Sequence, residues 1–121
     1  MNLNLNGRVQ VALNIGIALI DRIEMIHKAN YVHNDIKLDN IVIGDSGQER
    51  KQLGRLRIID FGTATKFMKN GNHVKESTYH KFEGNIFLNS AHVLANKPPS
   101  RRDDMISIGL LMIFLVDELP Y

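Results

Sequence analysis

The chain has 121 residues, a formal net charge of +2 and no cysteine. This length allows at most one domain, and so mild a charge balance does not indicate a nucleic-acid partner. Without cysteine there can be no disulfide framework, thiolate metal site or cysteine nucleophile, which suits a reducing compartment and disfavours secretion. We therefore expect a cytoplasmic or nuclear protein.

An apolar segment near the start predicts a long helix over residues 8–28. Its first part, VQVALNIGIALI, is too short to span a bilayer, which requires roughly 20 apolar residues. No small-residue cleavage site follows, and DRIEMIHKAN continues with helical spacing. Asn30 is expected to close the helix as a left-handed cap. We expect no membrane segment.

Two short β-rich segments predict a small β-hairpin. They are NIVIG at residues 40–44 and RLRIID at residues 55–60. The connection between them, DSGQERKQLG, is polar and contains turn residues. A polar, glycine-bearing stretch without clear periodicity follows over residues 62–84. It predicts no regular element.

A second helix is predicted after PPSRRDD. Two prolines end the preceding segment, and Ser100 can cap the helix together with Asp103, three residues further on. The next residues, MISIGLLMIFLV, are apolar on every side, which predicts a helix buried in a core. A helix of about twelve residues spans roughly 18 Å and cannot cross a membrane.

The stretch YVHNDIKLDNIVIG, residues 31–44, places polar residues between apolar flanks. Asp35, Lys37 and Asn40 stand in the pattern H-x-D-x-K-x-x-N, and Asp60 begins the tripeptide DFG twenty residues after Asn40. One carboxylate and one amide oxygen suit Mg²⁺ rather than zinc or copper. A carboxylate free of the metal can take a proton from a hydroxyl, and a nearby lysine can neutralise a phosphoryl oxygen. The pattern indicates phosphoryl transfer to an alcohol.

Three ordered motifs resemble those of eukaryotic protein kinases. HNDIKLDN is similar to the catalytic-loop pattern H-R-D-x-K-x-x-N, DFG to the metal-binding motif, and DMISIG to the D-x-W-S-x-G start of the central C-lobe helix. Within the kinases the chain most resembles the casein kinase 1 family and its vaccinia-related relatives, through LIDRIEMIHKANYVHNDIKLDN, SRRDDMISIGLLM and LPY. The resemblance runs over nearly the whole chain, from about residue 13. DFG alone would be a weak signal, but three motifs at family spacing are specific.

The resemblance implies an α+β fold in which residues 1–121 form a partial protein kinase domain. This part would be the mostly helical C-lobe portion with a small β-hairpin, comprising helix E, the catalytic loop, DFG, the activation segment and helix F, with the N-lobe absent. ATP and Mg²⁺ would be the cofactors. Asp35 would be the catalytic base on the substrate hydroxyl, and Lys37 would contact the transferred phosphate. Asn40 and Asp60 would bind the metal ions and, through them, the nucleotide.

Several of these residues have other interpretations. Asp35 and Asn40 could be turn formers alone, although the accompanying lysine and DFG argue against this. In the family the histidine at His33 packs inward, so we expect a supporting role. Asp104 resembles the helix F aspartate that accepts backbone hydrogen bonds from the catalytic loop, although carboxylates also favour helix N-termini for electrostatic reasons. A basic rim suited to acidic protein substrates and plain solvation both remain open for Arg101, Arg102, Lys66, Lys69, Lys75 and Lys81.

The chain also departs from the family pattern. Asn34 replaces an arginine that in many kinases meets a phosphate on the activation segment, so activity should not require that phosphate. Asn85 stands where serine/threonine kinases usually carry a threonine that touches the catalytic aspartate and lysine, and an amide can still hydrogen-bond there. Phe87 occupies the place of an anion-site arginine, which argues against a preference for pre-phosphorylated substrates. No G-x-G-x-x-G loop, V-A-I-K lysine or helix C glutamate occurs in the sequence.

Two functions from different classes therefore remain open. The first is a serine/threonine protein kinase fragment that transfers phosphate from Mg-ATP to a protein hydroxyl; DIKLDN favours this over tyrosine kinases, which usually show an A-A-R arrangement. The alternative, favoured by the missing phosphate-cradling loop, is a catalytically inactive fragment or pseudokinase that acts only by binding proteins. We expect the chain to be the middle part of a kinase, from a truncated gene model, a gene fragment or a relict. A protein substrate is expected, with neither nucleic acid nor membrane, and the oligomeric state stays open.

Overall fold

The described part of the chain combines helices with small antiparallel sheets. The computed structural model describes residues 3–44 and 55–117, and the predicted hairpin connection, residues 45–54, lies outside them. The helices are α1 (Leu5–Lys28), the 3₁₀ helix η1 (Leu38–Asn40), α2 (Ala91–Leu94) and α3 (Arg101–Val116). Within these ranges, no helix is both long enough and apolar enough to cross a bilayer.

The described strands form three two-stranded antiparallel sheets. β1 (Tyr31–Val32) pairs with β4 (Thr65–Lys66), β2 (Ile41–Ile43) with β3 (Leu56–Ile58), and β5 (Met68–Lys69) with β6 (Asn72–His73). The β2–β3 pair confirms the predicted hairpin strands. With the helices, these sheets make the described part an α+β fold, as expected.

The first helix is longer than the sequence analysis predicts. It begins at Leu5 rather than residue 8, because the Asn4 side chain accepts a hydrogen bond from the Gly7 backbone N–H at 2.8 Å and caps the helix. At the other end, Asn30 has a φ of 67°, which confirms the expected left-handed residue after the helix.

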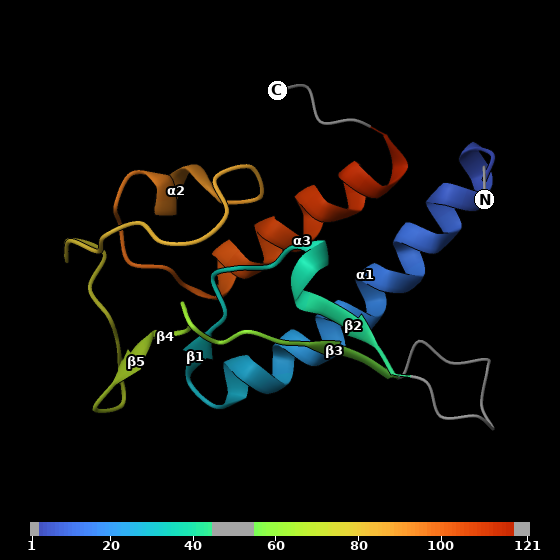
Figure 1. The fold of residues 1–121 in the computed structure, drawn as a ribbon. Coiled ribbons are helices and arrows are strands. Elements are labelled where there is room, and N and C mark those ends of the chain that lie inside the picture. Colours follow the sequence, from blue (N-terminus) through green and yellow to red (C-terminus); the bar gives the residue numbers. More distant parts are fainter. Residues whose placement is uncertain (1–2, 45–54, 118–121) are drawn as a thin grey trace.

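The helices α1 and α3 pack side by side and antiparallel, and the β2–β3 hairpin lies against α1 through β3 (Figure 1). Their direction follows from two contacts, Gly16 beside Met112 and His27 beside Asp104. Burial of apolar side chains between these elements provides the main stabilisation. The buried core cluster consists of Leu19, Ile23, Ile36, Leu56, Ile58, Leu88, Ile108 and Leu111.

The predicted start of α3 at Ser100 is confirmed, whereas the prediction that the helix is buried on every side is wrong. Ser100 and Asp103 form a capping box, in which the Ser100 N–H donates to Asp103 Oδ2 at 2.7 Å. The helix is not buried on every side, because Ile113 and Phe114 are 52% and 49% exposed. One face packs on α1, and the other meets little of the described chain. An all-apolar sequence indicates which helix is buried, but not how many of its faces are covered.

The stretch after DFG contains three short strands that the sequence analysis did not predict. β4, β5 and β6 each have two residues, too few to show an alternating pattern. The β5–β6 turn places Asn70 and Gly71 at positive φ, 52° and 77°, as in the Asn-Gly turns of β-hairpins. The dipeptide Asn-Gly was thus a readable signal for this hairpin.

Candidate active site

The β2–β3 hairpin brings two of the predicted site residues to the same end. Ile41 pairs with Ile58, and one step further the Ile59 N–H donates to the Asn40 carbonyl at 2.9 Å. In an antiparallel pair, the start of one strand lies beside the end of the other. Asn40, which leads into β2, and Asp60, which follows β3, therefore come from adjacent chain segments.

The Asp35 carboxylate has two oxygens in different situations. Oδ2 accepts a hydrogen bond from Asn40 Nδ2 at 2.9 Å and lies 3.2 Å from Lys37 Nζ. Oδ1 is buried and has no hydrogen-bond partner within the described residues. The structure thus brings Asp35, Lys37 and Asn40 together. It leaves Asp35 Oδ1 able to accept a further hydrogen bond.

Asn40 and Asp60 offer the hard oxygen atoms that Mg²⁺ prefers. Because Asn40 Nδ2 also donates to the Asp35 carbonyl at 2.8 Å, the amide oxygen is the Asn40 atom that could ligate a cation. Asp60 is exposed, has a φ of 61° and accepts the Gly62 N–H through Oδ1 at 3.1 Å. Residues 3–44 and 55–117 hold no cluster of three or more His, Cys, Asp or Glu suited to a metal. Asn40 and Asp60 provide an amide and a carboxylate oxygen, which are ligand types that Mg²⁺ takes together with phosphate and water.

His33 packs inward as expected and links the loop to the residues before DFG. It is fully buried, and its Nδ1 accepts a hydrogen bond from the Asp35 N–H at 3.2 Å. Nε2 must then carry the proton and donate to the Ile59 carbonyl at 3.0 Å. The ring also meets Phe61 edge-on, with centroids 5.1 Å apart. Both ring nitrogens of His33 are thus engaged in hydrogen bonds that support the loop.

Asp104 holds the same loop from α3. Its Oδ2 accepts the His33 N–H at 2.9 Å and its Oδ1 accepts the Asn34 N–H at 3.0 Å, which confirms the expected backbone contacts. The sequence analysis missed His27, whose Nε2 lies 2.8 Å from Asp104 Oδ2. Its position in the last turn of α1, just before the loop, was the available signal. Both long helices therefore help to fix the loop.

Comparison with known proteins identifies the family of this arrangement. Residues 8–121 match the protein kinase domain family. The chain belongs to the protein kinase family. This kinase sequence is 34% identical over 116 residues to a probable casein kinase I homolog of Encephalitozoon cuniculi, covering 93% of this chain and 36% of that protein. It is 32% identical over 111 residues to a casein kinase 1-like protein of Oryza sativa subsp. japonica, covering 88% of this chain and 15% of that protein. The chain is therefore casein kinase 1-like and spans about a third or less of these relatives' length.

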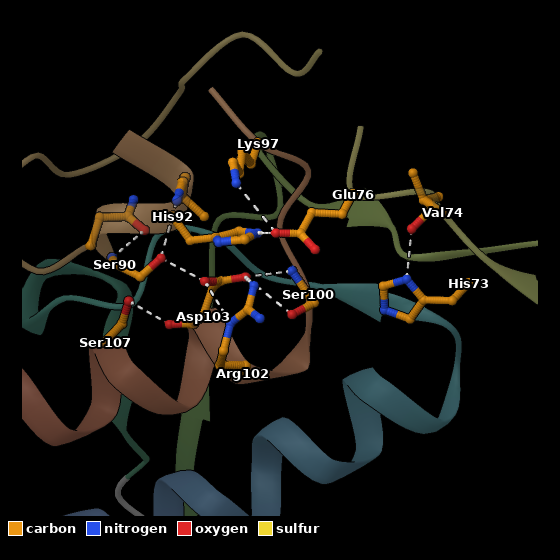
Figure 2. A network of polar contacts seen from close by, with 12 residues as sticks. His73, Val74, Glu76, Ser90, His92, Lys97, Ser100, Arg102, Asp103 and Ser107 are labelled. Carbon is orange, nitrogen blue, oxygen red and sulfur yellow. Dashed lines mark hydrogen bonds and ion pairs between the residues drawn. The ribbon is translucent and has the colours of Figure 1, made fainter. Parts of the chain in front are cut away.

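In this kinase chain, the segment after DFG is held by contacts that the sequence analysis did not predict. Lys97 and His92 approach Glu76 with nitrogen–oxygen distances of 3.3 Å and 3.5 Å, as Figure 2 shows. The His80 N–H donates to the Asn96 carbonyl at 2.9 Å. These contacts attach residues 76–80 to α2 and the turn after it.

Asn85, which departs from the kinase pattern, and Arg101, for which a basic rim and plain solvation both stayed open, have local partners. Asn85 Oδ1 accepts the Phe87 N–H at 2.7 Å, so this oxygen caps its own turn rather than contacting Asp35 or Lys37. The Arg101 guanidinium lies 5.0 Å from the centre of the Phe67 ring. The Asn85 oxygen and the Arg101 guanidinium are thus each engaged by a neighbouring part of the same chain.

Asp103 joins α3 of the kinase chain to α2 (Figure 2). Its carboxylate accepts hydrogen bonds from Ser90 Oγ at 2.5 Å and from the Ser100 N–H at 2.7 Å. Burial pushes the pKa of Asp103 upward, but these hydrogen bonds and the nearby Arg102 outweigh it and leave the pKa below the usual aspartate value. Ser90, which also caps α2, was not among the predicted residues.

Proposed function

We propose that this chain carries the phosphoryl-transfer site of a serine/threonine protein kinase, in the C-lobe portion of the kinase domain. The observation that supports this best is the carboxylate of Asp35. The residue is 7% exposed, and its Oδ1 has no partner among the described residues. A buried acceptor left unpaired costs about 1–3 kcal/mol. A hydroxyl group of the substrate would donate the missing hydrogen bond to Oδ1.

In the proposed reaction each residue has a distinct task. Asp35 Oδ1 accepts the hydrogen bond of the protein hydroxyl, orients it and takes its proton as the oxygen bonds to the terminal phosphorus of ATP. The bond from that phosphorus to the bridging oxygen breaks, and ADP leaves. Lys37, 30% exposed and 3.2 Å from Asp35 Oδ2, is placed to neutralise a phosphoryl oxygen. Asn40 and Asp60 would hold Mg²⁺, which when bound offsets the charge of the nucleotide phosphates. ATP and Mg²⁺ are thus the proposed cofactors.

Two features support a protein serine or threonine as the acceptor. The lysine two residues after Asp35 is typical of serine/threonine kinases, and the relatives are named as casein kinase 1 proteins. An acidic substrate and a cytoplasmic or nuclear location are further proposals that rest on the scattered lysines and arginines and on the absence of cysteine. The second candidate function is protein binding without catalysis, which the exposed Ile113 and Phe114 on α3 favour.

The test compares Asp35→Asn with Asp60→Asn. We expect Asp35→Asn to lower phosphoryl transfer to a serine peptide by roughly 10²–10⁴-fold while nucleotide binding persists, because its side chain acts on the hydroxyl. Asp60→Asn should weaken nucleotide binding only when Mg²⁺ is present, since it removes a charged ligand. Titration with a fluorescent ATP analogue, with and without Mg²⁺, separates the two. Asp39→Asn, at an exposed aspartate of the same loop, is the matched control.

Each outcome decides between the candidates. If Asp35→Asn loses nucleotide binding as fully as Asp60→Asn, the assigned roles are wrong. Transfer to a tyrosine peptide but not to a serine peptide would contradict the acceptor assignment. Binding of the nucleotide without any transfer by the unchanged chain would support the non-catalytic candidate.

A further inference from the structure

Asn34, the residue before Asp35, lies where two chain segments meet. It is 7% exposed and has a φ of 71°. Its Nδ2 donates to the Thr63 carbonyl at 2.9 Å and lies 3.0 Å from Thr65 Oγ1. A carbonyl oxygen only accepts hydrogen bonds, so the side-chain atom facing it must be the amide nitrogen. The Asn34 side chain therefore joins the loop of Asp35 to residues 63–65, just after DFG.

The partner segment is itself cross-linked at this point. Thr65 Oγ1 donates to the Thr63 carbonyl at 3.2 Å, so the two threonines and Asn34 form a closed set of hydrogen bonds. Thr63 Oγ1 donates to the His33 carbonyl at 3.2 Å, and Thr65 pairs with Val32 in the β1–β4 sheet. The side chains that join the two segments here, those of Asn34, Thr63 and Thr65, are all neutral, and His33 takes part only through its backbone carbonyl.

Asp35 cannot move independently of Asn34. The Asn34 N–H is bonded to Asp104 Oδ1, and the Asp35 N–H to His33 Nδ1, so the peptide groups on both sides of Asn34 are held. Gly84 packs against the same place, because a Cβ built on it would lie 2.7 Å from the Asn34 carbonyl oxygen. A shift of Asn34 should therefore be passed to the Asp35 carboxylate.

We propose that Asn34 is a positioning residue whose amide holds residues 63–65 against the catalytic loop and so sets the place of the Asp35 carboxylate. It does this with neutral hydrogen bonds, so the contact needs no phosphorylated residue on the segment. Asn34 acts through Asp35 and does not touch the substrate. The consequence for catalysis rests on the proposed function, whereas the positioning itself can be measured without any reaction.

The experiment uses the Asn40 side-chain amide as a reporter, because its Nδ2 donates to both the Asp35 carbonyl and Oδ2. In Asn34→Asp a carboxylate oxygen faces the Thr63 carbonyl, so the donor is lost at nearly constant size. In ¹⁵N-labelled full chain we expect the Asn40 side-chain resonances to shift. The amide exchange of Phe67, next to the joint, should rise on the order of tenfold, while α1 and α3 amides stay unchanged.

Asn72→Asp is the matched control, because the Asn72 Nδ2 makes one exposed hydrogen bond to the Asn70 carbonyl at 3.3 Å. It should leave the Asn40 resonances in place. Should Asn34→Asp fail to fold, Thr65→Val removes the hydroxyl from the joint, and Thr65→Ser retains it. Thr65→Val should shift the Asn40 resonances and Thr65→Ser should not.

Unchanged Asn40 resonances in Asn34→Asp or in Thr65→Val would overturn the proposal. Where phosphoryl transfer is measured, Asn34→Asp should lower kcat and leave the KM for ATP within about twofold, the pattern of a lost transition-state interaction. Absence of transfer in the unchanged chain would contradict the proposed function alone, because the Asn40 resonances report the positioning directly.

Discussion

At the scale of single residues, Gly84 shows how closely the activation segment approaches the catalytic loop. Its φ is 112°, a conformation that residues with a side chain rarely adopt. A Cβ at this position would also lie 2.7 Å from the Asn34 carbonyl oxygen. Backbone conformation and packing therefore exclude a side chain for two separate reasons.

We expect Gly84→Ala to lower the free energy of unfolding by about 1–3 kcal/mol, through backbone strain and displacement of Asn34. Urea denaturation measures the loss, and the backbone amide resonances of Asn34 and Asp35 report the displacement. Gly71→Ala is the matched control: Gly71 has a φ of 77°, but nothing lies within 4 Å of a Cβ built there. Gly71→Ala should lower the free energy of unfolding by about 1–2 kcal/mol, because only the left-handed backbone conformation is strained. Equal costs, with Asn34 unmoved in both variants, would contradict the packing argument.

At the scale of the elements, Asp103 ties the beginning of α3 to the beginning of α2. It accepts hydrogen bonds from Ser90, which caps α2, and from Ser100, which caps α3. These contacts act on the charged form of the carboxyl and hold its pKa below the usual value. The folded state therefore binds this proton more weakly than the unfolded chain does, which makes the contact a source of stability that depends on pH.

We expect Asp103→Asn to lower the free energy of unfolding at pH 7 by about 1–3 kcal/mol, because a charged hydrogen-bond acceptor is lost at a buried site. The contribution is present above the unfolded pKa, near 3.9, and is lost as the pH falls through the lower folded pKa. The difference between the two proteins should therefore shrink below about pH 4. Urea denaturation over a pH series measures it, with Asp21→Asn, at an exposed aspartate of α1, as control. A difference that does not change with pH would show that the charge of Asp103 is irrelevant.

At the scale of the whole molecule, the packing of α1 on α3 organises both the core and the site. Leu19 and Leu111 are fully buried in the cluster between these helices. The same pair of helices supplies His27 and Asp104, which hold the catalytic loop. The apolar core and the loop that carries Asp35 are therefore supported by the same two elements.

Leu19→Ala should lower the free energy of unfolding by about 2–5 kcal/mol, because it leaves a cavity between the helices. Leu13→Ala, on the same helix but 46% exposed, should change it by no more than about 0.5 kcal/mol. Urea denaturation of both variants, monitored by circular dichroism, gives the comparison. Similar losses in the two would mean that the helices do not pack as described.

The sequence by itself determined the features that depend on local pattern. Helical spacing predicted α1, and an apolar run after two prolines predicted α3. Cap residues such as Asn30 and Ser100 marked where helices end and begin, since capping requires only residues close in the chain. Two short β-rich segments, separated by a polar connection with turn residues, predicted β2 and β3. The order and spacing of the motifs around Asp35 and Asp60 indicated the kinase family, because family motifs are read directly from residue type and distance along the chain.

Only the tertiary structure decided how those parts meet. The pairing of β1 with β4 and the hydrogen bonds of Asn34 to Thr63 and Thr65 join residues some thirty positions apart, and two-residue strands carry no periodic signal. The contact of Asn4 with Gly7 that starts α1 is local, whereas His27 reaches Asp104 only because two helices pack antiparallel. The two unequal oxygens of Asp35 are likewise a result of packing. Residue types indicate which chemistry is available. The folded chain sets the direction of each side chain, and this decides which hydrogen-bond donors and acceptors stay unpaired.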